Sequence, residues 1–164
     1  MKIKKILILL LPAVLLLMMG CPVGLDYSLG TPGSESIDKS LIGTWVCKSE
    51  DAEVKRVKVA KGNDNSYAVT VLERGEMYSL ETDKLQGWVT TVKEKNFMYL
   101  QPEGDAKYYH YCYWMDGGDL STTDVALLDG GVDAVSSTET LRKQVETSMR
   151  MDDWGKETQE WVKE

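Results

Sequence analysis

Histidine is almost absent from this chain of 164 residues, because His110 is the only one. A single imidazole excludes sites that need several and leaves one candidate general base. No serine or cysteine nucleophile is tied to His110 by a recognised local pattern, and nothing resembles a phosphate-binding loop or a nucleophile elbow. We therefore expect no enzyme activity and no cofactor.

Basic residues are also in short supply, with 19 Lys and Arg against 26 Asp and Glu. Lys2, Lys4 and Lys5 belong to a segment that we expect to be removed, so 16 basic residues would remain in the mature chain. Such a chain has no basic stripe to neutralise phosphates, which excludes a nucleic-acid partner. We interpret the acidic surface as a solubility feature.

Metal ligands in a recognised spacing are missing as well. His110, Cys112 and Cys47 lack the close spacing of a zinc site. Several aspartates lie in or beside glycine-rich turns, namely Asp116, Asp119, Asp124, Asp129 and Asp133. Their spacing does not match a calcium loop, and the chemistry of turns explains them more simply. We expect no metal site.

The chain has one long hydrophobic run, at its start. Residues 1–5 are rich in lysine, and residues 6–19 are apolar except for an interruption at Pro12. A run of about fourteen residues is short for a membrane-spanning helix, which needs about twenty. The run is typical of an export signal over residues 1–20.

The end of this signal carries a more specific pattern. Leu17-Met18-Met19-Gly20-Cys21 resembles the lipobox of bacterial lipoproteins, with Met18 where that family usually has leucine. The resemblance implies that Cys21 carries fatty acyl chains such as palmitate, which hold the protein on a membrane. Pro22 after the cysteine, rather than aspartate, favours the outer membrane, facing the periplasm. The alternative is a plain secretory signal with Cys21 as an incidental thiol.

The segment after Cys21 is rich in Gly, Pro and Ser, which predicts a flexible tether over residues 21–40. The remaining residues, 41–164, suit a single domain.

Turn signals recur every eight to fifteen residues in this domain, the rhythm of an antiparallel barrel or sandwich. Turns are expected at residues 62–65, 95–96, 116–118 and 129–131. Eight strands are expected before the pattern becomes helical at residue 136. They lie at residues 41–47, 55–60, 67–71, 77–81, 86–94, 97–100, 107–115 and 120–128.

One amphipathic helix follows. Residues 136–139 fit a capping box, and Leu141, Val145 and Met149 then recur at helical spacing. The apolar stripe is narrow, so the helix should lie outside the sheet. Residues 158–163 favour a short closing strand over a continued helix. The fold class is therefore all-β with one external helix.

This order of elements, together with Gly43 and Trp45 in the first strand, resembles the lipocalin-like (calycin) barrels. The resemblance implies an antiparallel up-and-down barrel, with Trp45 at the closed end of a cup for a small apolar molecule. The residues expected to line the cup are Trp45, Trp88, Tyr99, Tyr111 and Trp114.

The strand over residues 107–115 is the most aromatic. Alternation places Tyr108, His110, Cys112 and Trp114 on one face and Tyr109, Tyr111 and Tyr113 on the other. If one face lines the barrel, the other packs under the helix. The aromatic side chains form either a ligand-binding wall or simply core.

Cys47 and Cys112 form an even pair once Cys21 is lipidated. In an oxidising compartment they are either a disulfide or two unpaired buried thiols, and the distance between their strands decides which.

The leading hypothesis is a lipid-anchored lipocalin-like protein that binds or carries a small apolar ligand. The alternative is a protein-binding module of the envelope, such as an inhibitor or an assembly accessory. A wide barrel interior favours the first, and a filled interior with an exposed aromatic patch favours the second. An enzyme would need His110 in a cleft beside an activated partner.

Overall fold

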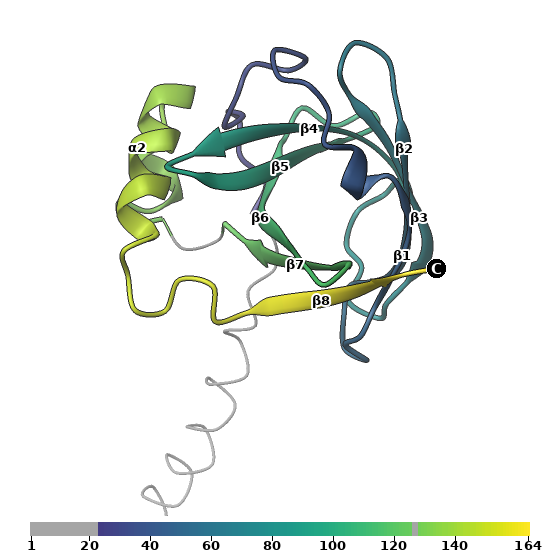
Figure 1. The fold of residues 1–164 in the computed structure, drawn as a ribbon. Helices are drawn as coiled ribbons and strands as arrows, with labels where there is room; N and C mark the ends of the chain where they lie inside the picture. Colours follow the sequence, from purple (N-terminus) through teal and green to yellow (C-terminus); the bar gives the residue numbers. More distant parts are fainter. Residues whose placement is uncertain (1–22, 126–127) are drawn as a thin grey trace, which may run out of the picture.

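A computed structural model describes residues 23–125 and 128–164 and places the strands in one closed antiparallel barrel (Figure 1). The predicted signal and its lipidation site, Cys21, lie outside the described residues. Each strand pairs with the next along the chain, and the last pairs with the first. The strands are β1 (Gly43–Cys47), β2 (Val54–Lys61), β3 (Tyr67–Arg74), β4 (Lys84–Val92), β5 (Lys95–Pro102), β6 (Tyr109–Asp116), β7 (Asp119–Asp124) and β8 (Thr158–Lys163). The up-and-down barrel predicted from the sequence is confirmed.

The barrel closes on β1. Trp45 in this strand faces Val57 of β2 on one side and Lys163 of β8 on the other. Gly43 leaves room for the Lys163 side chain, because a Cβ atom at this glycine would collide with the lysine Cε. The Lys163 ammonium group then lies 5.1 Å from the centre of the Trp45 ring, within the range of a cation–π contact. The glycine and tryptophan of the first strand therefore act together at the closing seam.

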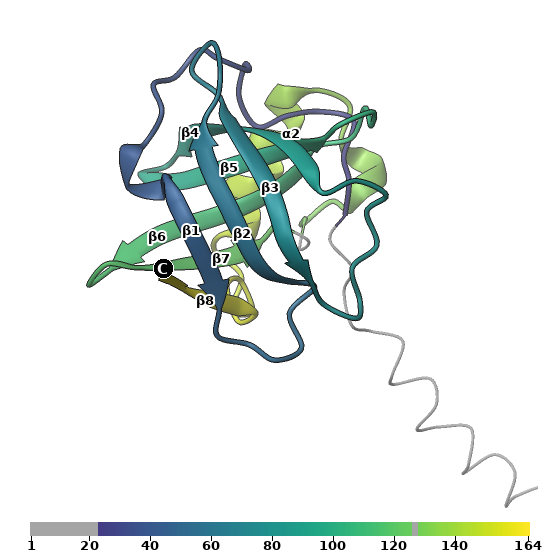
Figure 2. The ribbon, with the colours of Figure 1, turned by 90° about the vertical axis from the view of Figure 1, so that its right-hand side faces the viewer.

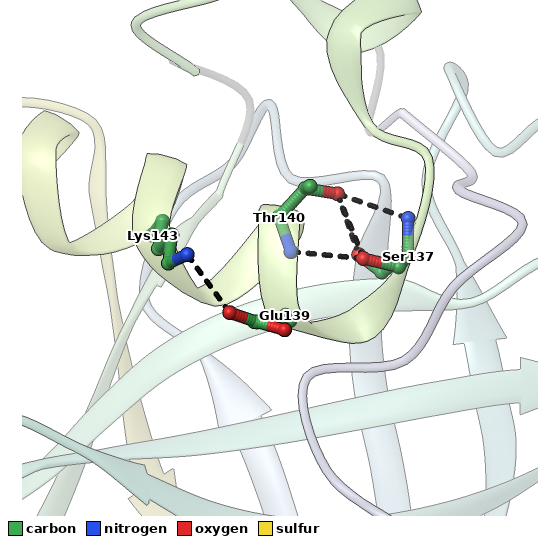
Figure 3. A network of polar contacts seen from close by, with 4 residues as sticks. All are labelled: Ser137, Glu139, Thr140 and Lys143. Carbon is green, nitrogen blue, oxygen red and sulfur yellow. Dashed lines mark hydrogen bonds and ion pairs between the residues drawn. The ribbon is translucent and has the colours of Figure 1, made fainter.

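Helix α2 (Thr138–Ser148) follows β7 and precedes β8 in the chain, and it lies outside the barrel (Figure 1). Its N-cap is Ser137, one residue later than predicted. The Ser137 Oγ accepts a bond of 3.1 Å from the Thr140 N–H, and the Thr140 Oγ1 accepts one of 2.9 Å from the Ser137 N–H (Figure 3). Glu139 instead forms an exposed ion pair with Lys143, at 2.8 Å. Threonine replaces the expected glutamate in the capping box, because its hydroxyl also reaches the N-cap N–H.

Three details of the strand prediction are wrong. Residues 77–81 form no strand; Met77, Tyr78 and Leu80 lie in the β3–β4 loop and contribute to the lining of the barrel cavity. The β4–β5 turn lies at Lys93-Glu94, both with positive φ (46° and 65°), rather than at residues 95–96. Strand β7 ends at Asp124, before residues 126–127, which are not described. Within residues 23–125 and 128–164, seven strands, not eight, therefore precede the helix.

The buried apolar residues form two clusters, one on each face of the β4–β6 wall. The inner cluster fills part of the barrel and contains Trp45, Val69 and Tyr113. The outer cluster joins Trp88 and Phe97 to the buried face of α2 and to residues near the start of the described chain. Strands β4–β6 are thus apolar on both faces, as is usual for strands covered on both sides.

Residues 23–40 pack on the barrel, which corrects the prediction of a flexible tether for this part. Leu25 and Leu29 are buried in the outer cluster, with 3% and 0% of their surface exposed. The segment crosses the outside of the barrel and ends in the short 3₁₀ helix η1 (Lys39–Leu41), beside the start of β1 (Figure 2). A second 3₁₀ helix, η2 (Val132–Ala134), precedes α2. The folded unit therefore begins well before residue 41.

Candidate functional site

The barrel encloses a cavity of about 450 Å³, within the range of small-molecule sites. All eight strands contribute side chains to its lining. The middle of the wall is mostly aliphatic, with Val57, Val59, Val69, Val71, Leu85, Met98 and Leu100. Such a surface can hold the apolar part of a ligand by excluding water from it.

One end of the cavity is closed by aromatic side chains and η1. Trp45 is fully buried, and its Nε1–H donates a bond of 2.8 Å to the Leu41 carbonyl. Nearby, the Tyr67 hydroxyl donates to the Asp38 carbonyl at 3.1 Å, and the Tyr113 hydroxyl donates to the Asp38 carboxylate at 3.2 Å. Burial raises the pKa of Tyr67 to about 12, so this hydroxyl stays protonated as a donor. These bonds hold the closed end rigid.

The other end is open and acidic. Its exposed lining residues are Asp51, Met77, Glu157 and Thr158. Four carboxylates line this part of the cavity, namely Asp51, Glu53, Asp124 and Glu157, and the lining contains no Lys, Arg or His. Within the described residues, none of the four forms an ion pair. The mouth therefore carries uncompensated negative charge.

Among the four carboxylates of the mouth, Asp124 has the largest pKa shift. The pKa of Asp124 is raised to about 6, mainly by burial and also by the neighbouring carboxylates Glu53 and Glu157, whereas the Val125 N–H lowers it. Burial also raises the pKa of Glu53. Tyr111 lines the same region, and burial together with the nearby Asp124 raises the pKa of its hydroxyl well above the usual range. A ligand entering the mouth meets carboxylates and a protonated phenol.

Two of the five predicted lining residues, Trp45 and Tyr111, do line the cavity. The other three lie elsewhere, which corrects their predicted placement. Trp88 and Tyr99 belong to the outer cluster, and Trp114 is 40% exposed outside the barrel. The predicted alternation along β6 is confirmed, since Tyr109, Tyr111 and Tyr113 line the cavity and Cys112 packs in the cluster that contains α2.

The outer face of β4–β6 carries its own aromatic group. Trp88 stacks on Tyr99 with ring centres 5.7 Å apart, and Tyr99 stacks on His110 at 6.2 Å. His110 is 2% exposed, and neither ring nitrogen has a hydrogen-bond partner among the residues that the structure describes. Burial lowers its pKa to about 4. His110 lies outside the cavity, in a packing position.

Cys47 and Cys112 are both buried and unpaired, so the disulfide alternative is not realised. Cys47 belongs to the inner cluster and Cys112 to the outer one. The barrel wall separates the two clusters, and burial raises the pKa of both thiols. Both cysteines act as small apolar side chains.

Sequence reasoning missed most of the aliphatic lining and the acidic mouth. The signal for the lining was the alternation itself. With Trp45 assigned to the interior, its neighbour Val57 follows, and Val59 lies on the same face two residues on. No local signal distinguished Asp124 from other aspartates near turns, because its burial and the proximity of Glu53 and Glu157 arise only when segments distant in sequence come together.

Comparison of the chain with models of protein families, with curated proteins and with solved structures finds no match. Within the described part of the chain, no helix combines the length and apolarity that crossing a bilayer requires. Over residues 23–125 and 128–164, no group of three or more His, Cys, Asp or Glu side chains is arranged to hold a metal ion.

Acidification is expected to act on His110 and Asp124 in opposite directions. Folded His110 binds a proton more weakly than unfolded histidine, so stability is lost, by about 3 kcal/mol, as pH falls from about 6.5 to about 4. Folded Asp124 binds a proton more tightly than unfolded aspartate, so about 3 kcal/mol is regained as pH falls from about 6 to about 4. The two effects should nearly cancel in the wild-type protein.

Single variants separate the effects of His110 and Asp124 on the pH dependence of stability. Relative to wild type, Asp124→Asn should be more stable at pH 7 and lose stability on acidification. His110→Phe should gain stability as pH falls over the same range. Urea midpoints at pH 7.5, 5 and 4 measure both, and parallel profiles for the two variants would contradict this assignment.

Proposed function

We propose that this protein is a lipid-anchored lipoprotein of the cell envelope whose barrel binds or carries a small apolar ligand. The observation that carries the proposal is the cavity of about 450 Å³, apolar along its wall, closed at one end and open at the other. The lipocalin-like barrel fold supports it, because closed barrels of eight strands have room for one small ligand.

The anchor rests on the sequence. The apolar run of residues 6–19 and the lipobox-like segment that ends at Cys21 support export followed by acylation. Pro22 supports the outer membrane, with the domain facing the periplasm.

The acidic mouth narrows the ligand class. An anionic head group placed beside Asp124, Glu53 and Glu157 would be repelled, whereas a neutral or cationic one would not. The aromatic rings of Tyr109 and Tyr111 also suit a cationic group. We infer an amphiphile with an apolar body and a head group that carries no negative charge.

Native mass spectrometry of residues 22–164, purified without detergent, tests the proposal. The chain must include residues 23–33, because Leu25 and Leu29 are part of the outer cluster. A bound small molecule is expected. Met98→Trp should reduce its occupancy by narrowing the cavity, whereas Met115→Trp, at a site 37% exposed outside the cavity lining, should not. Equal occupancy in both variants, or a ligand-free wild-type chain, would refute it.

Head-group charge gives a sharper prediction. Among amphiphiles with the same alkyl chain, an amine or an alcohol should bind at least about tenfold more tightly than a carboxylate at pH 7.5, because about 1.4 kcal/mol of repulsion suffices for that ratio. The double variant Glu53→Gln/Asp124→Asn should narrow the ratio, and Asp119→Asn, outside the cavity, should leave it unchanged. Titration calorimetry measures the three affinities. A carboxylate that binds best would contradict the ligand class.

A second candidate is a protein-binding module of the envelope. The observation that favours it is the β6–β7 hairpin, where adjacent Trp114 and Met115 are 40% and 37% exposed. A stoichiometric protein partner with an empty cavity would support it. We propose no catalytic step, since His110 is buried away from the cavity.

A further inference from the structure

We propose that the open end of the barrel faces the bilayer to which the chain is anchored, so that the ligand enters and leaves the cavity at the membrane surface. This inference rests on the proposed lipid anchor at Cys21 and adds the orientation of the cavity. The docked N-terminal segment supplies the argument.

The mouth of the cavity is formed at one end of the strands. Its side chains come from the β1–β2 loop, the β3–β4 loop, the start of β6, the end of β7 and the start of β8. Glu53, Met77 and Tyr109 represent the first three of these segments. The opposite end holds Trp45, Asp38 and Tyr113.

The described chain begins beside this mouth. Leu25 forms two backbone hydrogen bonds with Tyr108, of 2.9 and 2.8 Å, as an isolated β-bridge. Gly24 lies against Tyr109, since a Cβ atom at Gly24 would be 3.1 Å from the tyrosine hydroxyl. Tyr109 itself lines the mouth. An ion pair of 2.7 Å between Asp26 and Lys107 also fixes the start of the described chain beside β6.

The segment then runs away from the mouth and is fixed along its length. Leu29 is fully buried, and its carbonyl accepts a bond of 2.7 Å from Arg142 of α2. Further on, the Gly33 carbonyl accepts a bond from Asn65 in the β2–β3 turn, and Asp38 contacts Tyr113 at the closed end. The chain therefore passes from the open end to the closed end, and its start is fixed at the open end.

The length of chain before this segment sets the position of the anchor. Only Pro22 lies between Cys21 and Val23, so the two α-carbons are at most about 7 Å apart. The far end of β6, Asp116, lies seven residues beyond Tyr109, or about 23 Å along an extended strand. An acyl chain on Cys21 therefore brings the bilayer to the open end and not to the closed one.

The side chains at the mouth are consistent with a zwitterionic lipid surface. Met77 is 57% exposed there and offers an apolar contact. The four carboxylates of the mouth would repel anionic head groups. We therefore commit to a zwitterionic bilayer as the surface that the mouth faces.

Fluorescence quenching tests this orientation in the full-length, lipidated chain. Met77→Cys and Met115→Cys place matched labels at the two ends of the barrel, and native Cys47 and Cys112 are buried. In phosphatidylcholine vesicles with a quencher on the lipid head group, the Met77 label should be quenched several-fold more than the Met115 label. A spacer of about 20 Gly and Ser residues between Pro22 and Val23 should remove the difference, because it releases the anchor from the docked segment.

The outcomes separate the two proposals. Equal quenching of the two labels, or stronger quenching at Met115, in a chain with confirmed acylation overturns the orientation and leaves the anchor intact. A chain whose mass shows no acyl group on Cys21 overturns both. Ligand binding by the soluble chain 22–164 is measured separately and does not depend on either result.

Discussion

Replacement of Trp45 by alanine is expected to lower the free energy of unfolding by about 3–5 kcal/mol, the usual cost of emptying a tryptophan site in a core. Trp45 has no exposed surface, its indole N–H donates to the Leu41 carbonyl, and its ring lies under the Lys163 ammonium group. Its loss would loosen both the seam between β1 and β8 and the closed end of the cavity. Urea unfolding of residues 22–164, followed by circular dichroism, measures the change.

The matched control is Trp114→Ala. This side chain is 40% exposed outside the barrel, so the variant should lose less than about 1 kcal/mol. Similar losses in the two variants would mean that Trp45 does not hold the closed end as described. Trp45→Phe should fall between wild type and Trp45→Ala, because phenylalanine keeps an aromatic ring but cannot donate to Leu41.

Removal of residues 22–33 should lower the free energy of unfolding by an amount similar to that of Trp45→Ala. The deletion exposes the outer cluster and takes away Leu25 and Leu29, which are 3% and 0% exposed. Burial of each leucine contributes about 1.5–3 kcal/mol, so we expect a loss of about 3–6 kcal/mol. The bond from Arg142 to the Leu29 carbonyl is lost as well. Urea midpoints of chains that begin at residues 22 and 34 measure the difference, and binding of a hydrophobic dye reports the exposed cluster.

Asp26→Ala is the control for this deletion. It removes only an exposed ion pair with Lys107, so it should cost less than about 1 kcal/mol. A shortened chain as stable as the longer one would mean that residues 23–33 are a tether after all, and would also remove the argument for the orientation of the mouth.

The sequence predicted the barrel well because its signals were local. The turn cluster at residues 62–65 lies between β2 and β3, the cluster at residues 116–118 overlaps the end of β6 and leads into β7, and the closing strand over residues 158–163 has the predicted bounds. Local signals were less decisive where two adjacent residues could each fill the same role. Ser136 and Ser137 both suit an N-cap, and the choice of Ser137 depends on Thr140 reaching back to it.

The site was predicted less well, because alternation gives two faces without saying which is inside. Trp88 and Tyr99 were expected to line the cavity, yet they lie on the outer face of β4–β6, which is also buried. That second buried face exists because α2 and residues 23–29 cover it. The composition of residues 21–40 indicated flexibility, and nothing local in it revealed the packing of Leu25 and Leu29.

The sequence alone indicated an antiparallel meander of strands, the external helix, the closing strand and the expectation of export and lipidation, since each follows from residue types over short windows. Only the tertiary structure decided that the barrel keeps a cavity, that its mouth is acidic, and that the chain begins beside that mouth. These properties depend on residues brought together from distant parts of the chain, such as Glu53 with Asp124 and Gly24 with Tyr109. Their proximity is set by the closure and register of the strands.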